Sequence, residues 1–498
     1  MNVNPITRLD YPDPDVIRVE DTYYMVSTTM HFMPGCEILQ SFDLVHWEHA
    51  TYVYETLDHT DAQQLKSGQN IYGQGMWAAS LRYHEGRFYI CFVANDTRKT
   101  YLYTSEKIDG PWKKQLIDGF YHDGSLLFDE DGRNYIVYGN DEIWITELNE
   151  DLTAPKKDGL HRLLVSDHKN PELGYEGSHI QKINGYYYIF LIHSLRDRWM
   201  RTEACFYSDS LEGEFTGGDV LCDDRGYCGQ GVAQGGIVDT PDGKWYAMLF
   251  QDSGAVGRIP ILVPVTWKDH FPVFGQNGHV PEEIEVHSTR PGYIYQPLVG
   301  SDDFCNGLLP RWQFNHDPDP RYYHLDALQG TYTITTREVC TELTQAVNTL
   351  TQRMSYPSCA AEVTVDASAL KEGDVAGLCA LQGCYAAVGI TKHHGKYEVL
   401  MLDKKEDGIL DMTERTVVES HQMDFRLEAD FCNMKDEARC YYRVNKGDWL
   451  PIGTVHKLYF KLDHFTGCRF GLFCYAAEET GGSACFRDFK YYDVDEIS

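Results

Sequence analysis

The sequence predicts an all-β protein of two domains, a five-bladed β-propeller over residues 1–300 followed by a β-sandwich over residues 301–498. Three observations support this. A hairpin-like pattern recurs five times in the first 250 residues, and alternating strand-like segments dominate the remainder. A chain of 498 residues is also too long for one compact core, since single cores usually stop growing near ~250–300 residues.

The recurring pattern is a strand, a tight turn and an aromatic-rich strand. Four of the turns contain Gly, which follows Asp or Asn in three of them. Because Asn-Gly and Asp-Gly accept positive φ at little cost, they favour tight hairpins between strands. The copies are VIRVEDTYYMVS, LRYHEGRFYICF, LLFDEDGRNYIVY, IQKINGYYYIFL and IVDTPDGKWYAML, over residues 16–27, 81–92, 126–138, 180–191 and 237–249.

One aromatic position is common to all five copies. It is occupied by Tyr24, Tyr89, Tyr135, Tyr188 and Tyr246, which stand 46 to 65 residues apart. That spacing is the length of a four-stranded blade with its loops, so five copies predict a five-bladed propeller. The alternative is that the same turn signature belongs to the hairpins of a β-sandwich.

The repeat also predicts where the chemistry lies. Eleven or twelve residues before each shared tyrosine stand Asp13, Trp77, Asp123, Glu176 and Gln234. The first strand of a propeller blade is innermost, so residues just before it lie at one mouth of the central channel. We therefore expect these five side chains to face one another across the axis.

Three converging carboxylates are costly, because each raises the pKa of the others, and such a cost indicates a functional site. One carboxylate can stay ionised as a general base while another is held protonated as a general acid. Hydrolysis of a glycosidic bond requires that pair, and Trp77 would supply a stacking face for a sugar. Taken singly, each carboxylate is also explained as a turn or loop residue.

Composition excludes several partners. Lys and Arg total 44 against 75 Asp and Glu, a net charge of −31, which disfavours nucleic acid and anionic membranes. No segment approaches the ~20 apolar residues of a membrane span, and the first ten residues lack a signal-peptide pattern, so we expect a cytoplasmic protein. The 15 cysteines show no metal-ligand spacing and are expected to be reduced thiols.

Three segments, residues 11–35, 120–139 and 174–191, resemble the signature regions of glycoside hydrolase family 43, with its β-xylosidases and α-L-arabinofuranosidases. They read YPDPDVIRVEDTYYMVSTTMHFMPG, FYHDGSLLFDEDGRNYIVYG and GYEGSHIQKINGYYYIFL, and the resemblance covers nearly the whole chain. It implies a five-bladed propeller and inverting hydrolysis. It also implies that Asp13 is the general base, Glu176 the general acid, and Asp123 the residue that orients the acid and tunes its pKa.

The resemblance further implies sugar-binding residues. Arg258 resembles the sugar-binding arginine of the family, and the other positions that line the sugar subsite in relatives match Trp77, Met30, His31 and Phe32.

Gln234 departs from the family pattern, because many members carry there an axial histidine that holds calcium through water. An amide is a weaker partner for such a site. We expect no required cofactor, and structural calcium stays open.

From residue 301 the character of the sequence changes. Alternating segments such as AAEVTV, YEVLML, RCYYRV and KLYFKL predict an antiparallel sandwich, which we interpret as a concanavalin-like or lectin-like jelly roll. In family relatives with this architecture, a loop of the sandwich narrows the active-site mouth, which favours removal of terminal sugars. Asp302, Asp303 and Asp488 are candidate ligands for structural calcium, with solvent-facing positions as the alternative.

The resulting hypothesis is an exo-acting, inverting hydrolase that releases terminal β-D-xylose or α-L-arabinofuranose from xylo- or arabino-oligosaccharides of plant hemicellulose. Two alternatives remain. A non-catalytic glycan-binding propeller would use the same aromatic pocket, and a metal-dependent propeller hydrolase or lyase would place the carboxylates on a cation. The sequence distinguishes neither the two pentoses nor the linkage, and it leaves an oligomer possible.

Overall fold

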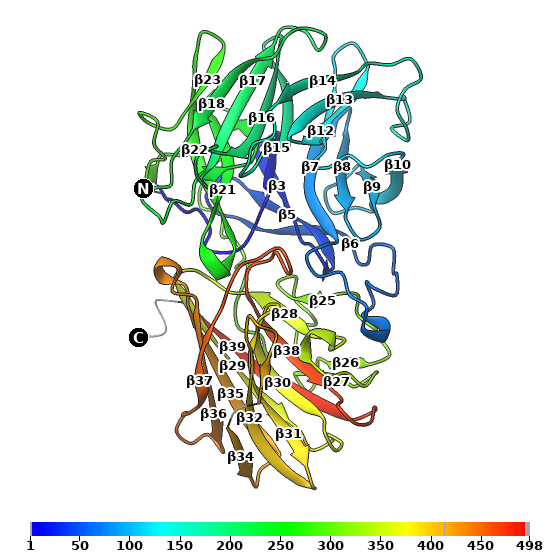
Figure 1. Cartoon of the computed structure of the whole chain (residues 1–498), viewed down its shortest axis with the longest axis vertical. Helices are drawn as coiled ribbons and strands as arrows, with labels where there is room; N and C mark the ends of the chain where they lie inside the picture. The colour runs from blue at the N-terminus through cyan, green and yellow to red at the C-terminus, as the bar shows by residue number, and fades with distance from the viewer. Residues whose placement is uncertain (1, 413, 494–498) are drawn as a thin grey trace.

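The structure is a computed structural model that describes residues 2–412 and 414–493. Figure 1 shows two β-rich bodies, with the N-terminal part above the C-terminal part. The predicted all-β fold is confirmed. The helical segments among the described residues are short 3₁₀ turns at Lys66–Gly68, Gly254–Val256, Leu343–Gln345 and Cys432–Met434.

The N-terminal part is the predicted five-bladed propeller, with five antiparallel blades within the described residues. The blades are β2 (Asp15–Val19), β3 (Thr22–Ser27), β5 (Gly35–Ser41) and β6 (Glu48–Tyr54); β7 (Met76–His84), β8 (Arg87–Ala94), β9 (Lys99–Ser105) and β10 (Lys113–Ile117); β11 (Ser125–Phe128), β12 (Asn134–Asn140), β13 (Glu142–Leu148) and β14 (His161–Ser166); β15 (Glu176–Ile183), β16 (Tyr186–Ser194), β17 (Arg201–Ser208) and β18 (Thr216–Leu221); and β19 (Val232–Ala233), β20 (Ile237–Asp239), β21 (Trp245–Asp252), β22 (Arg258–Lys268) and β23 (Phe271–Phe274). Innermost strands of neighbouring blades contact one another, β2 with β7, β7 with β11, β11 with β15, and β20 with β2, and the fourth and fifth blades meet through β17 and β19, so the ring is closed.

The first hairpin of the blades has the predicted tight turn. In the second blade Glu85 and Gly86 have φ of 47° and 77°, and in the fourth Asn184 and Gly185 have φ of 51° and 85°. Two successive residues at positive φ give a turn whose twist matches that of the paired strands. The turn dipeptides recognised in the sequence therefore form the hairpins.

The shared tyrosines pack between neighbouring blades, which explains why the aromatic position repeats. Aromatic pairs of this kind add to the stability gained from burial. The ring centroids lie 5.6 Å apart in Tyr24–Phe88, 4.6 Å in Tyr89–Phe128 and 5.3 Å in Tyr188–Trp267.

The C-terminal part is the predicted sandwich of two antiparallel sheets, whose facing sides enclose one apolar core. One sheet has the order β33 (Leu410–Asp411), β32 (Lys396–Lys404), β31 (Ala386–His393), β30 (Val375–Leu381), β38 (Arg469–Tyr475), β28 (Leu350–Arg353), β25 (Gln313–Asn315) and β4 (Phe32–Met33), and β34 (Arg415–Val418) pairs with β32. The other has the order β26 (Tyr323–Asp326), β27 (Thr331–Thr335), β39 (Ser483–Asp493), β29 (Ser358–Asp366), β35 (Gln422–Asp430), β36 (Glu437–Val444) and β37 (Leu450–Lys457).

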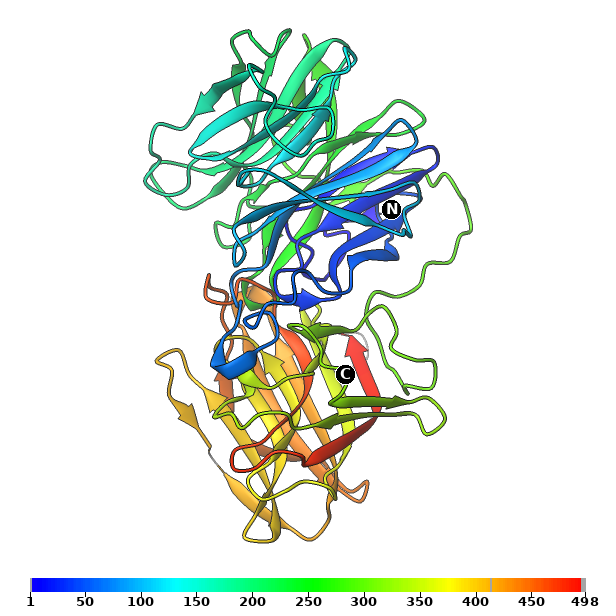
Figure 2. The same ribbon diagram turned by 90° about the vertical axis from the view of Figure 1, so that its right-hand side faces the viewer.

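The two parts are joined at a polar and aromatic seam. Strand β4 comes from the propeller sequence but pairs with β25 of the sandwich. The Asp10 carboxylate accepts hydrogen bonds from the amides of Arg258 in the propeller and Gly467 in the sandwich, at 2.7 and 2.8 Å. Figure 2 shows the connecting segment running down the outside of the seam. The predicted boundary at residue 300 stays a prediction, since β24 (Glu283–Ile284), which pairs with β1 (Asn2–Val3), ends before it and β25 begins at Gln313.

The cysteines and the helices can be compared directly with the sequence predictions. All fifteen cysteines lie within the described residues and are free thiols. Among the same residues, no helix has the length and apolar character needed to cross a membrane. Of the candidate calcium ligands in the sandwich, Asp302 uses both carboxylate oxygens as acceptors from Phe304 N and Trp312 Nε1, each at 2.8 Å.

Candidate active site

The innermost strands bring the predicted carboxylates to one mouth of the channel. Asp13 and Asp123 lie just before β2 and β11, Glu176 begins β15, and Gln234 follows β19. Asp13, Asp123 and Gln234 share a left-handed backbone, with φ of 52°, 49° and 62°. Such a conformation costs on the order of 1 kcal/mol in a residue other than glycine and tends to occur at functional sites. The same special backbone therefore recurs at equivalent positions of three blades.

Asp13 is buried and fixed by two donors. Its Oδ2 accepts a hydrogen bond from Thr28 Oγ1 at 2.6 Å, and its Oδ1 accepts one from Arg258 Nη1 at 3.0 Å. The guanidinium supplies a positive charge directly beside the carboxylate. Asp13 is thus held in one orientation with both oxygens acting as acceptors.

Arg258 links this carboxylate to the second domain. Its guanidinium is 2% exposed and lies 4.3 Å from the ring centroid of Phe465, a residue of the loop between β37 and β38. Its Nη2 donates to the Phe465 carbonyl oxygen at 3.4 Å. The predicted sugar-binding arginine is therefore clamped between Asp13 and a sandwich loop.

Asp123 and Glu176 are held side by side through the backbone. The amide of Gly177 donates to Asp123 Oδ2 at 2.9 Å, which places the residue before it, Glu176, next to Asp123. Glu176 Oε2 accepts a hydrogen bond from Asn140 Nδ2 at the end of β12, at 2.8 Å. The Glu176 side chain is 22% exposed and that of Asp123 only 6%, so Glu176 is the accessible member of the pair.

A histidine that the sequence analysis did not select lies between these two carboxyls. His122 Nε2 is 3.5 Å from Asp123 Oδ2 and 3.6 Å from Glu176 Oε2. The negative charge of Asp123, opposed by burial and supported by Glu176, raises the pKa of His122 to about 9. The available signal was its place in YHDGSL, directly before a predicted site carboxylate.

Burial raises the pKa of Asp123 to about 6; the positive charge of His122 opposes this shift, and the charges of Glu176 and Asp13 add to it. We expected Asp123 to act by holding a proton on its neighbour. In the structure the pKa of Asp123 is itself raised, because this carboxyl is buried and lies close to both other carboxylates.

Aromatic rings from both domains line this mouth. Trp77 is the second residue of β7 and stands just before a bulge; its ring centroid lies 6.2 Å from that of His122 and 5.4 Å from that of Phe465. A flat apolar face next to carboxylates suits a sugar ring. Phe465 could not be placed here from the sequence, because nothing local to it indicates that its loop reaches the propeller.

Gln234 lies beside the acid pair, as predicted. Its backbone amide donates to Glu203 Oε2 at 2.7 Å. A Cβ atom at Gly177 would lie 2.7 Å from Gln234 Cδ, so only glycine lets the amide side chain approach. Burial raises the pKa of Glu203 well above its ordinary value.

The channel axis next to the site is occupied by a guanidinium. Arg82 Nη1 donates to Asp15 Oδ2 at 2.7 Å, and His179 Nδ1 lies 3.0 Å from Asp15 Oδ1. Arg82 also donates to Ser125 Oγ at 2.7 Å. With a cation already on the axial carboxylate and an amide at Gln234, these residues do not fit a calcium ion on the axis.

Two groups within the described ranges bring three atoms of the types that bind metals within 4.8 Å of one another. They are His122 with Asp123 and Glu176, and the partly exposed set of Glu372, His393 and His394.

The predicted subsite residues Met30, His31 and Phe32 are fully buried. Met30 pairs with Met76 of the propeller, whereas Phe32 lies at the domain seam, where β4 pairs with β25. The His31 ring is 4.8 Å from that of His316 and 5.1 Å from that of His464, both from the sandwich. Both ring nitrogens of His31 and of His464 lack a hydrogen-bond partner in the described part of the chain.

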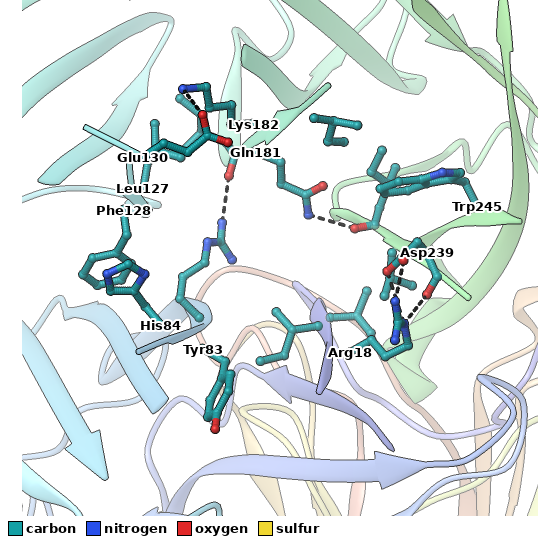
Figure 3. A pocket seen from close by; sticks show the side chains of 17 residues that line it. Arg18, Tyr83, His84, Leu127, Phe128, Glu130, Gln181, Lys182, Asp239 and Trp245 are labelled. Atoms are coloured by element: carbon teal, nitrogen blue, oxygen red, sulfur yellow. Dashed lines mark hydrogen bonds and ion pairs between the residues drawn. The ribbon is translucent and has the colours of Figure 1, made fainter. Parts of the chain in front are cut away.

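A cavity of 470 Å³ lies at the opposite mouth of the channel (Figure 3). Its lining includes Arg18, His84, Lys182, Asp239 and Trp245, and it contains none of the three carboxylates. Figure 3 shows Arg18 paired with Asp239, and Lys182 with Glu130.

Comparison with known families divides the chain in the same way as its sheets do. Residues 3–272 match Glycosyl hydrolases family 43. Residues 301–492 match the Beta xylosidase C-terminal Concanavalin A-like domain.

Individual relatives match along most of the chain. A β-xylosidase of Formosa agariphila is 27% identical over 556 residues, which cover 99% of this chain and 89% of the relative. A solved structure of a bifunctional GH43-CE protein of Bacteroides eggerthii is 42% identical with a TM-score of 0.92, over 100% of this chain and 64% of that one, so this chain spans less than two thirds of that protein. A GH43 glycoside hydrolase engineered to display both endo-xylanase and exo-arabinofuranosidase activity is 27% identical with a TM-score of 0.89, over 99% of each chain.

Proposed function

The chain belongs to glycosyl hydrolase family 43, and from this premise we propose that it is an exo-acting, inverting enzyme that releases terminal β-D-xylose or α-L-arabinofuranose from hemicellulose-derived oligosaccharides. That it is an O-glycosyl hydrolase follows from the family. The observation that carries the finer proposal is the convergence of Asp13, Asp123 and Glu176 from three blades on one mouth of the channel.

In the proposed reaction, Asp13 removes a proton from a water molecule as that water attacks the anomeric carbon. Arg258 and Thr28 hold the Asp13 carboxylate in place for this step. Glu176, the more accessible carboxyl, gives its proton to the departing glycosidic oxygen on the opposite face of the sugar. Such single displacement inverts the anomeric configuration.

Asp123 is proposed to act through Glu176. Its hydrogen bond from Gly177 N orients the backbone that carries Glu176. Its negative charge also disfavours loss of a proton from a neighbouring carboxyl, since two like charges at short distance repel.

Removal of terminal sugars is supported by the position of the sandwich loop. Phe465 packs on Trp77 and on Arg258, so the second domain covers one side of the mouth. A mouth narrowed in this way suits the end of an oligosaccharide better than the middle of a chain. The names of the relatives support both pentoses as substrates.

The test is hydrolysis of nitrophenyl β-D-xylopyranoside and nitrophenyl α-L-arabinofuranoside by wild type, Glu176→Ala and Glu172→Ala. Glu172 is an exposed glutamate of the preceding loop and provides the matched control. We expect wild type and Glu172→Ala to release nitrophenol at equal rates, Glu176→Ala to be slower on these activated substrates and far slower on xylo-oligosaccharides, and a chelator to have no effect. NMR of the first product should show the inverted anomer.

Different results would favour the alternatives. If wild type cleaves neither substrate but binds xylo-oligosaccharides, the glycan-binding propeller replaces the proposal. Loss of activity with a chelator, restored by a divalent ion, would favour a metal-dependent hydrolase. Retention of configuration would exclude the single-displacement reaction.

A further inference from the structure

We infer that His122 is a positioning residue of the reaction: its positively charged imidazole, between Asp123 and Glu176, sets the upper pH limit of activity. This inference rests on the proposed function, because it assigns His122 an effect on the proposed acid Glu176. The observations that carry it are the position of the ring, its missing hydrogen-bond partner and the charges around it.

The ring is placed to interact with two carboxyls at once. Its Nε2 lies 3.5 Å from Asp123 Oδ2 and 3.6 Å from Glu176 Oε2. The same nitrogen is buried and has no hydrogen-bond partner among the described residues. The His122 side chain is 20% exposed and lies near the Trp77 ring. A buried nitrogen with no other partner, close to two acceptors, fits a proton held between them.

The charges of the mouth require such a cation. Facing His122 are Asp123 from its own segment, Glu176 from β15 and Asp13 from before β2. Within the described residues, Arg258 is the guanidinium that contacts these carboxyls, and it is paired with Asp13. Asp123 and Glu176 therefore have a cationic partner only when His122 carries a positive charge. The raised pKa of His122, about 9, agrees with a protonated ring at neutral pH.

The consequence concerns the basic side of the pH profile. A positive charge next to two carboxyls stabilises their ionised forms, so the pair gives up its last proton at a lower pH than it would alone. In the proposed reaction the acid must be protonated, so its ionisation ends activity. Removal of the His122 charge should therefore extend activity to higher pH.

The test is the pH dependence of kcat/KM for wild type, His122→Gln and His122→Phe. The substrate is xylobiose or an arabinofuranosyl xylo-oligosaccharide, because the leaving oxygen of a sugar must be protonated to depart. The basic limb should move up by about one to three pH units in both variants, the size of effect that a neighbouring charge has on a carboxyl. A purely structural role would lower the rate without moving the limb.

The matched control is His161→Gln, which removes an exposed histidine on β14 of the same blade, stacked on Trp144 at 5.2 Å. Its profile should equal that of wild type. Thermal unfolding of all variants shows whether they are folded. If His122→Gln and His122→Phe are folded and their basic limb stays in place or moves to lower pH, the inference is wrong.

A second measurement does not depend on catalysis, so failure of the proposed function would not hide failure of this inference. In wild type labelled with carbon-13 histidine, the NMR signal that is missing from His122→Gln should titrate near pH 9, above the ordinary value of about 6.5. Titration at or below 6.5 would overturn the inference even if the enzyme hydrolyses pentosides.

Discussion

The two mouths of the propeller channel are built from the same innermost strands but balance their charges in opposite ways. At the active mouth Asp123 and Glu176 lie close together, and their nearest cation is His122. At the far mouth each strong charge has an opposite partner: Arg18 with Asp239, and Lys182 with Asp129 at 2.7 Å. Neighbouring parts of single strands therefore differ sharply in electrostatic balance.

This difference in charge balance distinguishes a candidate functional site from an ordinary protein surface. Matched ion pairs at the far mouth are explained by stability and solubility alone, even though a cavity of 470 Å³ lies there (Figure 3). The unbalanced carboxylates, the left-handed Asp13 and Asp123 and the buried His122 Nε2 without a partner all lower stability, and they occur together at the other mouth. The cavity alone would have selected the mouth that lacks the three carboxylates.

The largest expected effect is on catalysis at the active mouth. Asp13→Asn should lower kcat/KM by about 10²–10⁴-fold on both nitrophenyl pentosides and oligosaccharides, because water activation is needed for either leaving group. Glu176→Gln should be equally severe on oligosaccharides but milder on nitrophenyl substrates, since nitrophenolate leaves without a proton. Steady-state kinetics on the two substrate types measures this.

The far mouth provides the control for that experiment. Asp239→Asn changes a carboxylate in the same way and should leave both rates close to wild type. If Glu176→Gln lost the same factor on both substrate types, Glu176 would not be the proton donor.

The next effect concerns the axis between the mouths. Asp15 is fully buried, and although burial raises its pKa, Arg82 and His179 bring it below the ordinary value. Arg82→Met removes the main cation and leaves a buried charge, which should cost about 3–5 kcal/mol of the free energy of unfolding. Denaturant unfolding measures the loss, and activity per folded molecule should change much less than stability.

The double variant Asp15→Asn with Arg82→Met tests the cause. It removes both charges and should recover a large part of the lost stability. No recovery would mean that Arg82 stabilises the axis by packing and not by its charge.

The sequence predicted what depends on local pattern. The turn dipeptides and the shared tyrosines predicted the blades, and the common offset placed Asp13, Asp123 and Glu176 correctly, because a repeat puts equivalent residues at equivalent positions. His122 was also readable, directly before Asp123, but a single histidine has many structural explanations.

What could not be predicted depends on docking of distant segments. Phe465 reaches Arg258 from more than 200 residues away, and nothing in its loop indicates that contact. The same holds for the packing of His31 against His316 and His464 at the seam. Only the fit of two folded domains determines such neighbours.

The two mouths also differ because a loop of the sandwich covers only the mouth with the three carboxylates. A buried histidine in that loop predicts that acid lowers the free energy of unfolding. His464 directly precedes Phe465 in the loop between β37 and β38 and lies at the seam. Burial lowers its pKa to about 3. A neutral histidine whose folded pKa lies below its unfolded value of about 6.5 stabilises the fold fully above pH 6.5, and this contribution is lost as pH falls toward 3. By pH 5 the loss from this group should reach about 2 kcal/mol.

His464→Phe keeps a ring against Tyr72 but cannot take up a proton. It should therefore reduce the difference in unfolding free energy between pH 7 and pH 5 by about 2 kcal/mol. The exposed His324 provides the control, since His324→Phe should leave that difference unchanged. An equal difference in wild type and His464→Phe would show that this histidine does not make the seam sensitive to acid.

The smallest effect is expected from the ion pair at the far mouth. Arg18 and Asp239 are paired through their side chains, which are 23% and 38% exposed, so water and salt screen their attraction. Arg18→Gln, Asp239→Asn and the double variant form a cycle whose coupling energy should be below about 1 kcal/mol and should fall with added salt. Activity should stay at the wild-type level in all three. A coupling of several kcal/mol, or a loss of activity, would mean that the far mouth is more than a balanced surface and that charge imbalance alone does not mark the site.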